Sequence, residues 1–143
     1  MHEISLQMIN HNVASFWWKE LVSHFMQFGD SLEIRCWKEE TSEIQQATFY
    51  GNPTADKHEV SIKGEVCEKF ISELLSEDPL DKSIYNKMTK YFTINVTHKQ
   101  RLFCSAHYGT EIYIVGASDD DIALFKDIMK QYTEEDFSVH IVR

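Results

Sequence analysis

The fold is decided by residues 91–132, which read YFTINVTHKQRLFCSAHYGTEIYIVGASDDDIALFKDIMKQY. Apolar and polar residues alternate along three runs, 91–97, 101–107 and 112–115, and each run is rich in β-branched or aromatic side chains. A period of two is typical of strands whose two faces meet different surroundings. Because only a few residues separate the runs, the sequence predicts three antiparallel strands joined by hairpins.

Each predicted strand has one aliphatic side and one side of mixed character. The aliphatic side carries Phe92, Ile94, Val96, Leu102, Cys104, Ala106, Ile112 and Ile114. The mixed side carries Tyr91, Phe103, Ser105, His107 and Tyr113. We expect helices to cover the aliphatic side, and the mixed side to suit water in part and a binding partner in part.

A helix is predicted directly after these strands. Ser118 and Asp121 have the spacing of a capping box, and the aspartates at 119–121 fill a first turn, where the helix dipole favours anions. The apolar residues that follow at helical spacing are Ile122, Phe125, Ile128, Met129 and Tyr132. They form one apolar face, which should pack on the aliphatic side of the strands.

The remaining segments continue this pattern. Further strands are predicted at 2–9, 31–38, 44–50, 58–63 and 137–143, further helices at 13–28, 65–77 and 81–90, and a loop at 51–54. Residues 31–77 and 91–132 therefore share the order of three strands and a helix. The sequence predicts an α+β fold with a mainly antiparallel sheet and helices packed on one face, as one sheet or as two βββα halves. No linker is visible, so residues 1–143 are expected to form a single domain.

Charge is distributed unevenly along the chain, whose net charge is −9. Segment 119–136 holds seven acids and two lysines, and segment 65–81 holds six acids and one lysine, so each has a net charge of −5. Segment 82–101 holds five basic residues and no acid, a net charge of +5. Two acidic helical segments are more concentrated than solubility requires, which favours a surface complementary to a basic partner.

Composition also indicates where the protein works. No apolar run approaches the length of a membrane span, and the first residues lack the pattern of a secretion signal. The three cysteines, Cys36, Cys67 and Cys104, lie far apart and are expected to be reduced thiols, with Cys36 and Cys104 in the core. The sequence therefore predicts a cytoplasmic protein that does not enter a membrane.

No motif indicates catalysis, a metal or a cofactor. The seven histidines form no pair with metal-ligand spacing, and the run of aspartates at 119–121 lacks the glycine and distant glutamate of a calcium loop. Ser105 and His107 share a strand face but lie too far apart for a direct hydrogen bond, and no nucleophile elbow is present. We expect no catalytic residue, no bound metal and no cofactor.

The leading hypothesis is a non-enzymatic acidic binding protein that neutralises a basic protein. Small, acidic, motif-poor immunity proteins that inhibit nuclease toxins have this general profile. Acidic residues would steer the partner and aromatic anchors would hold it. The predicted partner-binding residues are Asp119, Asp120, Asp127, Glu134, Glu135 and Asp136 for charge, and Trp37, Phe103, His107 and Tyr113 on the strands.

Two alternatives belong to other functional classes. The first is a small-ligand-binding or hydrolytic domain that uses the mixed sheet face, with His107 as its polar group. The second is a nucleic-acid-binding module that uses the basic segment 82–101 through phosphate contacts and stacking. The net charge of −9 and the absence of a recognition motif disfavour the second alternative.

Overall fold

A computed structural model describes residues 1–78 and 87–143 of the chain. The strands are β1 (His2–Met8), β2 (Ser31–Trp37), β3 (Gly51–Ala55), β4 (Glu59–Glu65), β5 (Thr93–His98), β6 (Arg101–Ala106), β7 (Glu111–Ala117) and β8 (Phe137–Val142). The helices are α1 (Phe16–Phe25), α2 (Thr41–Thr48), α3 (Glu68–Ser76) and α4 (Asp119–Met129). The predicted α+β class is confirmed.

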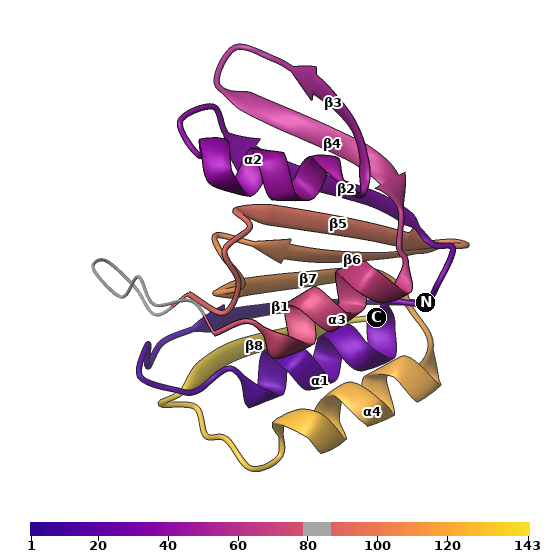
Figure 1. Ribbon diagram of the computed structural model, residues 1–143. Coiled ribbons are helices and arrows are strands. Elements are labelled where there is room, and N and C mark those ends of the chain that lie inside the picture. Colours follow the sequence, from indigo (N-terminus) through magenta and orange to yellow (C-terminus); the bar gives the residue numbers. More distant parts are fainter. Residues whose placement is uncertain (79–86) are drawn as a thin grey trace.

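All described strands belong to one sheet of eight strands in the order β3-β4-β2-β5-β6-β7-β1-β8, and every neighbouring pair is antiparallel. The two halves anticipated from the sequence are joined where β2 pairs with β5. The helices lie as a layer on one face of the sheet (Figure 1). We call the opposite face, which carries alternate residues such as Glu33, Cys104 and Tyr113, the open face.

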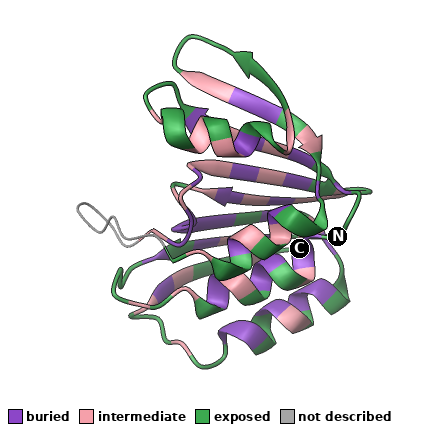
Figure 2. Ribbon diagram, in the orientation of Figure 1, coloured by how far each residue is buried: buried purple, intermediate pink, exposed green. Residues whose placement is uncertain are grey.

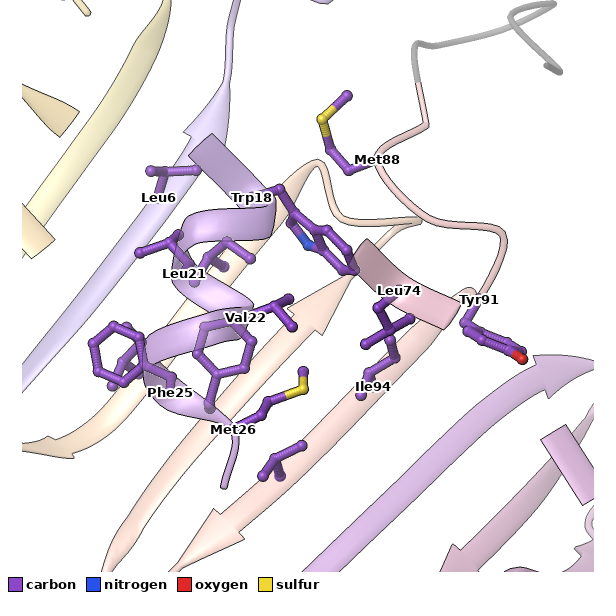
Figure 3. Close-up of a cluster of buried hydrophobic side chains, with 14 of the residues drawn as sticks. Leu6, Trp18, Leu21, Val22, Phe25, Met26, Leu74, Met88, Tyr91 and Ile94 are labelled. Carbon is purple, nitrogen blue, oxygen red and sulfur yellow. The ribbon is translucent and has the colours of Figure 1, made fainter. Parts of the chain in front are cut away.

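Helix α1 occupies the middle of the helical layer, between α3 and α4 (Figure 1). Its side chains Trp18, Leu21, Val22 and Phe25 are fully buried, and Figure 3 shows them above the strands and beside Leu74 of α3. Figure 2 shows buried residues on the inner sides of the helices and exposed residues on their outer sides. The core therefore lies between the helical layer and one face of the sheet, as the period of the apolar residues requires.

One predicted strand is wrong. Residues 44–50 belong to helix α2 and its end, and the predicted loop at Gly51–Thr54 lies in strand β3. Ala47 of α2 is buried against the sheet, and Gln46 and Tyr50 both donate hydrogen bonds to Glu73 of α3. These contacts favour the helix, so the first half is built as βαββα and only the second half as βββα.

The predicted facing of the strand at 101–107 is also wrong. A two-residue turn joins β5 to β6 and sets the register in which Ile94 lies opposite Ser105 and Val96 opposite Phe103. Phe103 and Ser105 therefore face the helices and are fully buried, whereas Cys104 faces outward. Phe103 stacks on Phe25 at a ring-centroid distance of 5.5 Å. Leu102 and Ala106 share the outward direction of Cys104, because side chains alternate along a strand.

The hydroxyl of Ser105, which this register buries, has a hydrogen-bond partner. The hydroxyl of Ser105 accepts a hydrogen bond of 3.1 Å from the indole Nε1 of Trp18. Tyr91, predicted on the mixed side, is likewise buried, and its hydroxyl donates to Glu73. The predicted short helix at 81–90 falls largely outside the described residues, and residues 87–90 are not helical.

Candidate functional site

The structure divides the predicted partner-binding residues between two places. The acidic members lie on α4 and in the turn that follows it, within the helical layer. Trp37 and Tyr113 lie on strands at the open face, and His107 lies in the turn between β6 and β7. Phe103 is fully buried and is not available as a surface anchor. The predicted set is therefore not one continuous surface.

One of the predicted acidic residues, Asp127, lines a groove between α1 and α4. The groove is a hollow of about 520 Å³ lined by Phe16, Lys19, Glu20, Ser23, His24, Leu124, Asp127 and Ile128, which we call the acidic groove. Phe16 is 70% exposed although it is a large apolar residue at the start of α1. Leu124 and Ile128 supply further apolar surface from α4. An exposed phenylalanine beside an apolar floor is a common feature of partner-binding surfaces.

A capping box determines where α4 begins and how its acidic side chains are arranged along the helix. Ser118 caps the helix by accepting a hydrogen bond of 3.1 Å from the backbone N–H of Asp121, and the Asp121 carboxylate accepts one of 3.0 Å from the backbone N–H of Ser118, so the predicted capping box is confirmed. From this start, Asp120, Leu124 and Asp127 follow at helical spacing along one side of α4, and Leu124 and Asp127 line the groove beside α1. The cap therefore fixes which carboxylates border the groove.

Not every acid of α4 is available to a partner. Asp121 is buried, and its carboxylate pairs with Arg101 at 3.0 Å and lies 3.5 Å from Nε2 of His24. Burial raises the pKa of Asp121, but the backbone N–H of Ser118 and the charge of Arg101 outweigh burial and lower it. Asp119 contacts His2 at 2.6 Å at the far end of the helix.

Other acids near the groove remain at the surface. Asp127 pairs with Lys130 at 2.9 Å in an exposed ion pair, which is a weak interaction. The carboxylate of Asp136 accepts hydrogen bonds from Asn10 and from the backbone of Thr133, which hold the turn after α4. Among the residues that the structure describes, Asp120, Glu134 and Glu135 form no ion pair and are exposed. These carboxylates are free to interact with a cationic partner.

Part of the second acidic segment is internal, although Glu65, Glu68 and Asp78 are exposed. Glu73 of α3 accepts hydrogen bonds from Tyr50, Gln46 and Tyr91, and it pairs with Lys90 at 3.2 Å. Burial raises the pKa of Glu73, but the hydrogen bonds from the two tyrosines and from the glutamine outweigh it and lower the pKa. The segment therefore offers a partner fewer carboxylates than its sequence suggests.

Several basic side chains of segment 82–101 are likewise engaged in contacts within the protein. Arg101 pairs with Asp121 and Lys90 pairs with Glu73, while Lys87 lies 4.2 Å from the ring centroid of Tyr108. Within the part of the chain that the structure describes, these contacts reduce the positive charge available to nucleic acid. Lys82 lies outside the described residues.

Aromatic side chains gather at the strand ends on the other side of the protein. Phe92 contacts Trp37, His107 and Tyr108, with ring-centroid distances of 4.8, 5.6 and 5.3 Å, and we call these four residues the aromatic corner. His107 and Tyr108 both have positive φ angles, of 49° and 61°, which is uncommon for residues other than glycine. Two predicted residues, Trp37 and His107, are thus brought together by Phe92.

The carboxylate of Glu111 connects the aromatic corner to Tyr113. Glu111 is buried, contacts Nδ1 of His107, and accepts hydrogen bonds from Tyr113 at 2.7 Å and from Gln7 at 2.9 Å. Glu111 is not among the site residues predicted from the sequence, although its position two residues before Tyr113 on the same strand face signals the contact. The carboxylate of Glu111 positions the side chains of His107, Tyr113 and Gln7. Its oxygen atoms are already engaged by these contacts.

These arrangements do not build a hydrolytic site from the predicted residues. Ser105 is buried under the helices and bonded to Trp18, whereas the side chain of His107 is 55% exposed in the turn. Burial raises the pKa of Cys36 to about 12 and that of Cys104 to about 11, so neither thiol is activated. Cys104 lies half-buried on the open face, which corrects its predicted place in the core.

A search among the described residues for three or more histidine, cysteine, aspartate or glutamate side chains able to hold a metal ion found no such group. None of the described helices is long and apolar enough to span a membrane. Comparisons of the chain with models of protein families, with curated proteins and with solved structures found no match.

Proposed function

We propose that this chain is a non-enzymatic binding protein for a positively charged protein and that the partner docks in the acidic groove. The observation that carries the proposal is the exposed Phe16 beside the apolar surface of Leu124 and Ile128, with Glu20 and Asp127 at the border. Apolar surface supplies lasting contact, and surrounding carboxylates select a cationic partner and raise the rate of encounter.

The charge around the acidic groove supports this choice of partner. Segment 119–136 carries a net charge of −5, and Glu20 adds a carboxylate from α1, against Lys19. The ion pair between Arg101 and Asp121 is internal, so it does not cancel the exposed acids. A cationic helix or loop with apolar residues on one side is complementary to such a groove.

The partner class that we propose is a protein whose working surface is itself positively charged, such as a nuclease-type toxin. A protein bound over such a surface would compete with nucleic acid and act as an inhibitor or immunity protein. The proposal rests on charge complementarity and on the form of the groove, which are also the properties that the following experiment changes.

The first test measures binding of a synthetic amphipathic helical peptide with lysines on one side and leucines on the other. Fluorescence anisotropy at low salt should detect binding that weakens as salt is raised. The triple variant Glu20→Lys, Asp120→Lys, Asp127→Lys should lose affinity by about tenfold or more, because it reverses the charge of the border. Phe16→Ala should weaken binding at every salt concentration, because it removes apolar contact rather than charge.

The matched control reverses exposed acids at a distance from the groove. Glu65→Lys, Glu68→Lys, Asp78→Lys makes the same change in net charge on and beside α3. The control should bind the peptide with an affinity close to that of the parent protein. Equal loss in the two triple variants, together with normal binding by Phe16→Ala, would show a general charge effect and remove the groove from the proposal.

A further inference from the structure

The two edges of the sheet are protected to different degrees. Edge strand β3 has five residues, contains Pro53 and runs into Asp56 and Lys57, all of which discourage pairing with another strand. Edge strand β8 reads FSVHIV, with neither proline nor lysine. Val139 and Val142 are 38% and 59% exposed. Edge β8 therefore has the composition of a strand that pairs.

Backbone geometry shows which groups β8 presents. The carbonyl oxygen of Asp136 accepts a hydrogen bond of 2.8 Å from the N–H of Ile9, so Asp136 faces β1. Because direction alternates along a strand, Phe137, Val139 and Ile141 point their N–H and C=O groups away from β1. The N–H of Phe137 donates to the carbonyl oxygen of Thr133 at 3.2 Å, whereas the outward groups of Val139 and Ile141 make no backbone hydrogen bond within residues 1–78 and 87–143. They form a free edge ready for a further strand.

We propose that β8 pairs antiparallel with β8 of a second copy of this chain, around a two-fold axis at His140. The eight-stranded sheets of the two copies would then form one continuous sheet with both helical layers on the same side. This register sets Val139 opposite Ile141 of the second copy, so that two outward-facing residues exchange hydrogen bonds and both side chains face the helices.

Charge at the ends of β8 favours a second copy as the occupant. Glu134, Glu135 and Asp136 precede the strand, and Arg143 follows it. Antiparallel self-pairing sets Arg143 of one copy opposite Phe137 of the other, next to the acidic turn that precedes β8. The net charge of −9 on each copy opposes association, so added salt should strengthen the dimer. Binding of a cationic partner in the acidic groove has the opposite salt dependence, so the two proposals fail independently.

Disulfide trapping tests the register. In a background where the exposed Cys67 is replaced by serine, His140→Cys should form a cross-linked dimer on mild oxidation, since residue 140 faces its own copy across the axis. Val139→Cys is the matched control, because the two residues 139 lie diagonally at about 8 Å, beyond the reach of a disulfide. Failure of His140→Cys to cross-link, or equal cross-linking by Val139→Cys, would overturn the proposed register.

Sedimentation velocity tests the pairing without an introduced thiol. The unmodified chain should show a concentration-dependent dimer that increases with salt. Val139→Pro should lower the association constant by about tenfold or more, because proline removes an outward N–H and its ring obstructs the incoming strand. The monomer should keep its far-UV circular dichroism, since that N–H does not bond to β1. A chain that stays monomeric across the concentration series would refute self-association, even if Val139→Pro failed to fold.

Discussion

Glu73 of α3 and Glu77, the residue that follows the helix, have pKa values shifted in opposite directions. Glu73 is held below its usual range by Tyr50, Tyr91 and Gln46, as described above. Burial raises the pKa of Glu77 to about 7, against a hydrogen bond from Thr89 and the charge of Lys90, which act to lower it. One oxygen of Glu77 is buried without a hydrogen-bond partner among the described residues. Spacing along the helix alone would not distinguish the two side chains.

The raised pKa of Glu77 predicts a loss of stability with rising pH. The folded protein holds a proton there up to a pH of about 7, whereas the unfolded chain releases it near 4.5, so stability falls between these values as pH rises. Glu77→Gln should remove this fall, which is on the order of 3 kcal/mol. Urea unfolding between pH 4 and 8 measures it, as those limits enclose both values. Glu68→Gln, at an exposed position of α3, should keep the pH dependence of the parent protein, and an unchanged slope in Glu77→Gln would contradict the prediction.

The N-terminus of α4 is an element whose sequence and structure agree. Ser118 makes the hydrogen bond that its spacing from Asp121 predicts, and the acidic first turn complements the helix dipole. Segment 44–50 is an element where they differ. The sequence predicts a strand there, but contacts of Gln46 and Tyr50 with Glu73 favour a helix. Local signals suffice where a cap completes itself within one turn, and fail where the partner is distant in sequence.

The cap predicts a measurable cost of substitution. Ser118→Ala should lower the free energy of unfolding by about 1 kcal/mol, because the N–H of Asp121 loses its acceptor. Ser72→Ala, at an exposed interior position of α3, is the control and should be neutral or slightly stabilising, since alanine is the better helix former. Chemical denaturation of both variants provides the comparison. Equal effects would show that the hydroxyl of Ser118 contributes nothing as a cap.

The protein as a whole pairs its charged segments with one another. The segment of net charge +5 supplies Arg101 to Asp121 and Lys90 to Glu73, in the two segments of net charge −5. The fold therefore buries part of the charge that the sequence presents and leaves the acids around the acidic groove at the surface.

Because Arg101 is paired inside the protein and Lys130 at its surface, replacing the two cations should lower the free energy of unfolding by different amounts. Arg101→Gln should destabilise the protein by about 2–4 kcal/mol, because it leaves the carboxylate of Asp121 buried without its cation. Lys130→Gln should leave stability nearly unchanged, because its pair with Asp127 is exposed to water. Thermal and urea unfolding report both values. A small effect of Arg101→Gln would show that water or His24 compensates the carboxylate.

The sequence by itself determined the α+β class, the strands of residues 91–117 and the helix that follows, because alternation, hairpin turns and capping are properties of neighbouring residues. The binding residues were less predictable. Phe103 and Tyr113 look alike as aromatic members of strands, yet the register across the turn at 99–100 buries Phe103, whereas Tyr113 on β7 faces outward beside Cys104. Pairing across the sheet decided which side of β6 faces the helices, and packing of α1 beside α4 created the groove that exposes Phe16. Such features depend on contacts between residues far apart in the chain, which no local pattern encodes.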